Sequence, residues 1–146
     1  MTNTGIRLSQ INLHHSKSAS AVLARSMAKV QTHVALIQEP WVWRGRIRGL
    51  NAGGELFAGT RDEGARACIF IKGVNGFLFQ ELCSRDCATI KIEVEDRESR
   101  LKPLIVSSAY LPHDREIPTE EMKKVVEYCK RKNLDLIIGC DAIAHH

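Results

Sequence analysis

The sequence has no apolar run long enough to span a membrane, and its first residues, MTNTGIRLSQ, lack the apolar core of a signal peptide. It also has no internal repeat and no low-complexity segment. Of its 146 residues, 44% are hydrophobic and 26% are charged, which is typical of a globular chain with a real core. We therefore expect one intracellular domain with no membrane partner.

The cysteines form no CxxC pair and lack the His/Cys spacing of a zinc site. The five are Cys68, Cys83, Cys87, Cys129 and Cys140. We expect most of them to be small buried hydrophobic residues and free thiols, because an intracellular compartment is reducing. A nucleophilic role for Cys140 would require a base and a lowered pKa, and the sequence supplies neither.

An apolar run, Val34 to Ile37, ends two residues before Glu39, which Pro40 follows directly. Such a run predicts a strand that is covered on both faces. Pro40 has no N–H for the ladder and should restrict Glu39 to an extended backbone. Glu39 should then lie at the carboxyl end of a buried strand, where open α/β sheets bind ligands. The alternative is a solvated glutamate at a strand end.

Three further segments have the pattern of a strand that ends in a polar side chain. The segment 134–139 leads to Asp141, the segment 103–110 ends in Tyr110, and the segment 6–13 carries Asn12. Carboxylates that meet at one sheet edge are suitable ligands for a hard cation such as Mg²⁺. For Asn12 the competing interpretation is a side chain that stabilises a turn.

The rest of the chain predicts a layered α/β fold. A helix should begin at Ser16 or Ser18 and run to Val30, with Ala19, Val22, Leu23, Met27 and Val30 forming its apolar stripe. Short strands are expected at 55–59, 67–71, 77–82 and 88–94, and a second helix should open at Pro118-Thr119.

The segment 41–54, WVWRGRIRGLNAGG, is the best nucleic-acid candidate in the sequence. Arg44, Arg46 and Arg48 can hold phosphates, and Trp43 or Trp41 can stack on a nucleotide. The net charge of +4 fits an anionic partner. The alternative is that the tryptophans belong to the core and the arginines form a solvated strand face. The glycines here do not match a Walker or dinucleotide motif.

Four strings, QINLHHSKSASAVL, ALIQEPWVWRGRIRGL, SSAYLPHD and IIGCDAIAHH, resemble the endonuclease/exonuclease/phosphatase superfamily. More narrowly they resemble the apurinic-endonuclease-like domain of arthropod non-LTR retrotransposon Pol proteins. The resemblance implies an α/β fold, namely the N-terminal portion of a four-layer α/β/β/α sandwich with mixed and antiparallel sheets and outer helices. It also implies Mg²⁺-dependent nicking of DNA for target-primed reverse transcription, with Mn²⁺ as an alternative cation.

The resemblance further implies roles for individual residues. Asn12 and Glu39 match the metal-site positions, Tyr110 matches a phosphate-contacting tyrosine, and Asp141 matches the acid that orients the attacking water. The implied partners are DNA and the reverse-transcriptase part of the same polyprotein. The implied location is nuclear if the retrotransposon is active.

Two departures from the family pattern lead to further expectations. Ile143 stands where the family has an asparagine, and the sequence ends at His146, before the second half of the sandwich and its Asp-His pair. We therefore expect a domain truncated at its C-terminal end, with inner sheet faces left uncovered and little nuclease activity. The alternatives are a catalytically dead nucleic-acid-binding remnant and a phosphatase of small molecules or lipids.

Overall fold

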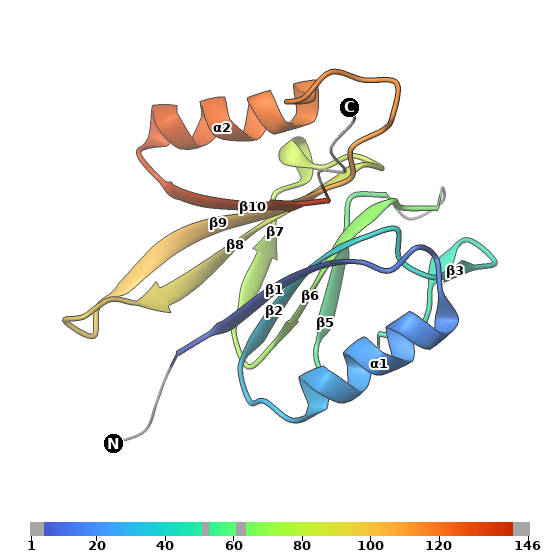
Figure 1. Ribbon diagram of the computed structural model, residues 1–146. Helices are drawn as coiled ribbons and strands as arrows, with labels where there is room; N and C mark the ends of the chain where they lie inside the picture. Colours follow the sequence, from blue (N-terminus) through green and yellow to red (C-terminus); the bar gives the residue numbers. More distant parts are fainter. Residues whose placement is uncertain (1–4, 51–52, 61–63, 142–146) are drawn as a thin grey trace.

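Two four-stranded sheets pack face to face, and each carries one helix on its outer face (Figure 1). The computed structural model describes residues 5–50, 53–60 and 64–141. This arrangement is the layered α/β fold that the sequence predicts, and it has the mixed sheets and outer helices of the α/β/β/α sandwich that the family resemblance implies. Neither helix within the described ranges has the length and hydrophobicity of a membrane span.

The first sheet has the strand order β1-β2-β6-β5. Its strands are β1 (Arg7–Asn12), β2 (His33–Gln38), β6 (Ala67–Lys72) and β5 (Glu55–Ala58). Only β1 and β2 run parallel, and α1 (Lys17–Ala28) connects them. Every residue of β2 is buried, as its apolar run predicts.

The second sheet has the order β10-β9-β8-β7. Its strands are β10 (Asp135–Cys140), β9 (Leu101–Ala109), β8 (Cys87–Glu95) and β7 (Gly76–Leu78). The parallel pair here is β9 and β10, joined through α2 (Glu120–Lys132). The short strands β3 (Val42–Trp43) and β4 (Arg46–Ile47) lie between β2 and β5 in sequence, and the 3₁₀ turn η1 (Gln80–Leu82) lies between β7 and β8.

Both helices begin at the caps that the sequence predicts. The Ser16 hydroxyl accepts a hydrogen bond from the Ala19 N–H at 3.1 Å, and the Thr119 hydroxyl accepts one from the Met122 N–H at 3.3 Å. Asn133, with a φ of 54°, ends α2 in the left-handed conformation.

The space between the sheets is filled by side chains of this chain. Eight residues of this inter-sheet core are each at most 1% exposed: Val34, Leu36, Ile69, Ile71, Ala88, Ile90, Ile92 and Val106. The expectation that the inner faces lack cover is therefore wrong for the described sheets. The reason is that β7 to β10, which all lie within the chain, already supply the second layer.

Two smaller predictions need correction. Val22 is 57% exposed and does not belong to the apolar stripe of α1, whereas Ser20 is fully buried and donates its hydroxyl to the Ser16 carbonyl. The expected strand 77–82 is divided, because β7 ends at Leu78 and the chain then turns into η1. All five cysteines are free thiols, as expected.

Candidate active site

The two parallel strand pairs bring the four predicted polar side chains to one place. Within the first sheet Asn12 lies opposite Gln38, so Glu39 follows directly beside it. Within the second sheet Cys140 lies opposite Ala109, so Asp141 and Tyr110 follow in the same way. Because parallel strands end at the same edge, all four side chains lie at one edge of the sandwich.

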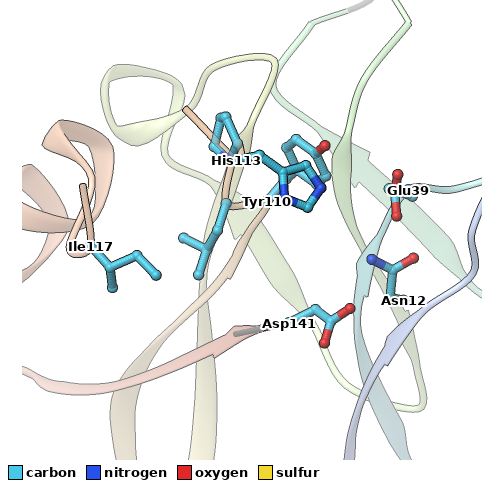
Figure 2. Close-up of a pocket in the computed structure, with 8 residues that line it drawn as sticks. Asn12, Glu39, Tyr110, His113, Ile117 and Asp141 are labelled. Carbon is cyan, nitrogen blue, oxygen red and sulfur yellow. The ribbon is translucent and has the colours of Figure 1, made fainter. Parts of the chain in front are cut away.

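These side chains line one pocket together with His113 (Figure 2). Asn12 and Glu39 form one wall, Tyr110 and His113 face them, and Asp141 comes from β10 between the two walls. The remaining lining residues are Leu111, Pro112 and Ile117. The structure therefore brings together the four residues that were expected to form a catalytic site.

Gln38 holds the two sheets together directly beneath this pocket. Its buried side-chain amide donates to the Ser108 hydroxyl at 3.0 Å and to the Gly139 carbonyl at 3.2 Å, and it accepts from Gln10. Ser108 in turn donates to the Ile37 carbonyl at 2.7 Å. These bonds fix the end of β2 relative to the ends of β9 and β10, and hence Glu39 relative to Tyr110 and Asp141.

Glu39 has a φ of 48°, so it is left-handed and not extended as its position before Pro40 predicts. Backbone hydrogen bonds impose this conformation. The Glu39 N–H donates to the Arg66 carbonyl, and the His15 N–H donates to the Glu39 carbonyl, both at 2.8 Å. Backbone strain of this kind is concentrated at functional sites.

The Glu39 carboxylate accepts no hydrogen bond from the described residues and meets two histidine rings instead. Its oxygens lie 3.5 Å from the Nδ1 atom of His14 and 3.5 Å from the Nε2 atom of His15. The other ring nitrogen of His15 lies 3.1 Å from the Pro40 carbonyl. His14 and His15 therefore lie against the Glu39 carboxylate at the edge of the pocket.

Asn12 does stabilise a turn, because its side-chain oxygen accepts the His14 N–H at 2.8 Å. It still lines the pocket beside Glu39, so the two interpretations of Asn12 are compatible. No group of three or more His, Cys, Asp and Glu side chains in the described ranges could by itself hold a metal ion. A cation here would need the amide oxygen of Asn12, water or substrate oxygens to complete its shell, which is the usual condition of protein-bound Mg²⁺.

Tyr110 is positioned by Arg66 and Asp86. The Arg66 guanidinium lies 4.6 Å from the Tyr110 ring centroid and makes two hydrogen bonds to the Asp86 carboxylate, at 2.5 and 2.7 Å. Donation of these hydrogen bonds to the Asp86 carboxylate raises the pKa of Arg66. The Tyr110 N–H donates to the Asp86 carbonyl at 2.8 Å, so both the ring and the backbone of Tyr110 are held.

Cys140 does not line the pocket, and its surroundings are not those of a reactive thiol. Burial, and to a smaller extent the neighbouring Asp141 carboxylate, raise the pKa of its thiol. A reactive cysteine needs the opposite shift, because the thiolate is the attacking form.

The arginine segment lies outside the pocket. Arg44, Arg46, Arg48 and Trp43 are not among its lining residues. They form the hairpin of β3 and β4, in which Trp43 is 51% exposed. The interpretation that Trp43 belongs to the core is therefore wrong, because the side chain lies on the hairpin surface.

Several residues around the predicted four were not predicted from the sequence, among them His113, Gln38 and Arg66. His113 follows Tyr110 by three positions in the SSAYLPHD string, so this proximity was an available signal. Gln38 and Arg66 carried no signal, because their partners lie 20 or more positions away. Ile143, His145 and His146 lie outside the described residues.

Comparison with known proteins shows the fold. No protein-family model matches the chain, and a search of curated proteins finds no match. Among solved structures, the chain is similar to the endonuclease domain of TRAS1, a telomere-specific non-LTR retrotransposon, with a TM-score of 0.67 and 24% identity. The match covers 97% of this chain and 61% of that chain. The described residues therefore adopt the fold of a retrotransposon endonuclease domain over about three fifths of its length.

Proposed function

We propose that the chain is part of a metal-dependent endonuclease that hydrolyses a phosphodiester bond of DNA. In a non-LTR retrotransposon the resulting nick would prime reverse transcription. The observation that carries this proposal is the pocket itself, in which Asn12, Glu39, Tyr110 and Asp141 converge from four strand ends of two sheets. The structural likeness to an endonuclease domain supports nuclease chemistry at this edge.

Glu39 and Asn12 would hold a divalent cation, Mg²⁺ or alternatively Mn²⁺. Both supply oxygen donors. The Glu39 carboxylate would bind the cation beside the rings of His14 and His15, whose nitrogens lie 3.5 Å from its oxygens. When bound, such a cation neutralises the negative charge that develops on the phosphate.

The other side chains act on the substrate directly. Tyr110 has a phenolic O–H that can donate to a phosphate oxygen, and Arg66 and Asp86 keep its ring in place. Asp141 can accept a proton from water and so orient it for in-line attack on phosphorus, without a covalent enzyme intermediate. The P–O3′ bond opposite the water would break, and the 3′ oxygen would take up a proton to leave a 3′-hydroxyl and a 5′-phosphate. Outside the pocket, Arg44, Arg46 and Arg48 would bind the DNA backbone.

A second function, binding of nucleic acid without cleavage, is favoured by one feature of the sequence. Ile143 replaces the asparagine of the family motif, and a hydrocarbon cannot donate to a phosphate. The arginine hairpin does not depend on residue 143 and would still bind DNA.

Plasmid nicking distinguishes the two functions. The chain and its Ile143→Asn variant are incubated with supercoiled DNA in Mg²⁺, in Mn²⁺ and in EDTA. We expect nicking that requires the cation, that increases in Ile143→Asn, and that is lost in Glu39→Gln. Glu127→Gln, an exposed change on α2, is the matched control and should leave the rate unchanged.

Two outcomes would reject catalysis by this site. Nicking that persists in EDTA or in Glu39→Gln would place the activity elsewhere. DNA binding without nicking by either variant, in either metal, would establish the binding function instead.

A further inference from the structure

The turn of the β3–β4 hairpin contains an arginine that its geometry does not require. Arg44 and Gly45 connect Trp43 to Arg46, with φ values of 54° and 74°. Two-residue turns with positive φ at both positions match the twist of a hairpin and favour Asn, Asp or Gly at the first position. Arginine at positive φ is strained. The presence of Arg44 therefore needs an explanation other than folding.

Trp43 lies beside two guanidinium groups on the hairpin surface, and a third arginine, Arg46, is its partner in the strand register. The Cζ atoms of Arg44 and Arg48 lie 4.4 and 5.6 Å from the indole centroid, and Arg46 faces Trp43 across the hairpin. The Arg48 Nε–H also donates to the Trp43 carbonyl at 3.5 Å. Half of the Trp43 surface remains open to solvent.

Among the described residues, no acid forms an ion pair with these cations. None of the ion pairs between described residues involves Arg44, Arg46 or Arg48. In the loop 96–100 of the same chain, by contrast, Arg100 is paired with Glu98. An exposed indole beside guanidinium groups that no described acid pairs matches a nucleotide, which has a π face and an adjacent phosphate.

The hairpin is close to the candidate active site along the chain. Trp43 follows Glu39 by four residues, and four residues span at most about 14 Å. Base pairs stack at intervals of about 3.4 Å. Trp43 can therefore reach a nucleotide within about four base pairs of a phosphate bound at the proposed cation site of Glu39. In a fully paired duplex the base faces are covered by neighbouring bases, so a side chain can stack only where a base is unpaired or displaced.

We propose that Trp43 is a stacking platform for an unpaired base, with Arg44 and Arg48 binding the phosphates beside it. The preferred ligand is DNA that is single-stranded or locally unpaired. The position of this base relative to the scissile phosphate rests on the proposed nuclease function. The stacking itself does not, and it is measured by binding alone.

The test uses the full chain with Glu39→Gln, which prevents cleavage, and with Trp41→Phe, which leaves Trp43 as the only indole. The protein is titrated in EDTA with a paired 20-mer duplex, with the same duplex carrying a three-nucleotide bulge, and with the single strand. We expect Trp43 fluorescence to be quenched by the bulged and single-stranded DNA, with Kd about tenfold lower than for the duplex.

Three variants separate stacking from charge and from folding. Trp43→Ala should remove the preference for unpaired DNA, whereas Trp43→Phe should keep most of it; for these two variants binding is read by anisotropy of labelled DNA. Arg44→Asn suits the turn, so it should maintain the melting temperature while weakening binding to all DNA and reducing the salt slope by about one unit. Phe77→Ala is the matched control, because Phe77 is 62% exposed and lines a different pocket with Ile6, the residue before β1.

Equal affinity for paired and unpaired DNA, or a preference that survives in Trp43→Ala, would overturn the proposal. Quenching by anionic phospholipid vesicles without any preference among DNAs would overturn it in favour of a membrane surface. Metal-dependent nicking by the chain with Glu39 unchanged, without a preference for unpaired DNA, would reject the stacking role alone. A preference without nicking would reject the nuclease function and leave the stacking role standing.

Discussion

At the scale of single residues, Arg66 contributes to the candidate active site at three points. Its carbonyl accepts the N–H of Glu39, its guanidinium lies over the Tyr110 ring, and its side chain makes a bidentate pair with Asp86. The Asp86 side chain is only 8% exposed, whereas that of Arg66 is 31% exposed. The nearly buried Asp86 carboxylate therefore fixes the Arg66 guanidinium. The Asp86 carbonyl fixes the Tyr110 backbone next to the start of β8.

We predict that Asp86→Asn reduces both stability and the catalytic rate. Charge-assisted hydrogen bonds contribute about 1.5–3 kcal/mol, so urea unfolding should show a loss of about that size. Release of Arg66 should also free the Tyr110 ring, so nicking should decline more than DNA binding does. Arg100→Ala is the control, because its pair with Glu98 is exposed and should contribute less than about 1 kcal/mol. Equal effects of the two changes would show that Asp86 has no special role.

At the scale of secondary-structure elements, Gly139 allows β10 to approach β2. A Cβ atom at this position would lie 2.7 and 2.9 Å from two atoms of the Leu36 side chain and 3.1 Å from Gln10. A side chain at position 139 would therefore fit only if the Leu36 and Gln10 side chains moved. The Gly139 carbonyl also accepts the Gln38 amide, so the close approach and the inter-sheet hydrogen bond depend on each other.

We predict that Gly139→Ala moves the two sheets apart at the site. Overpacking in a closed core costs about 1–3 kcal/mol, which urea unfolding would detect. The shift should displace Asp141 from Glu39 and lower the nicking rate beyond the loss of stability. Gly64→Ala is the matched control, since its nearest neighbour would be a Val42 methyl at 3.7 Å and its φ is not positive. A neutral Gly139→Ala would mean that the inter-sheet spacing has room to adjust.

The strand ends were predictable from the sequence, and the connections between them were not. Apolar runs that stop at Glu39, Tyr110 and Asp141 are local patterns, so the residues that converge in the pocket were identifiable. The Gln38 hydrogen bonds, the Arg66 pair and the left-handed Glu39 all depend on partners far along the chain. Local rules therefore predict an extended Glu39, and the tertiary hydrogen bonds override them.

At the scale of the whole molecule, the layers cover one another within the described chain. The inter-sheet core is closed. Each outer helix packs on its own sheet through a separate apolar cluster, which includes Met27 of α1 in one case and Val125 of α2 in the other. Large exposed hydrophobic side chains remain on the outermost strands, among them Leu8 at 40% on β1 and Ile137 at 37% on β10. Such scattered exposure is normal for a folded surface and does not interrupt the core.

We predict that residues 1–146, expressed alone, unfold in one cooperative transition. Because the core is closed, loss of any one layer would expose the other layers to water. Far-UV circular dichroism and tryptophan fluorescence should therefore report the same urea midpoint. Ile90→Ala, at a fully buried position between the sheets, should lower the free energy of unfolding by about 2–5 kcal/mol. Leu101→Ala, at a position 62% exposed, should change it by no more than about 0.5 kcal/mol. A broad transition with separate midpoints, or binding of a hydrophobic dye under native conditions, would show that the described layers do not stabilise one another and that the sandwich needs further strands.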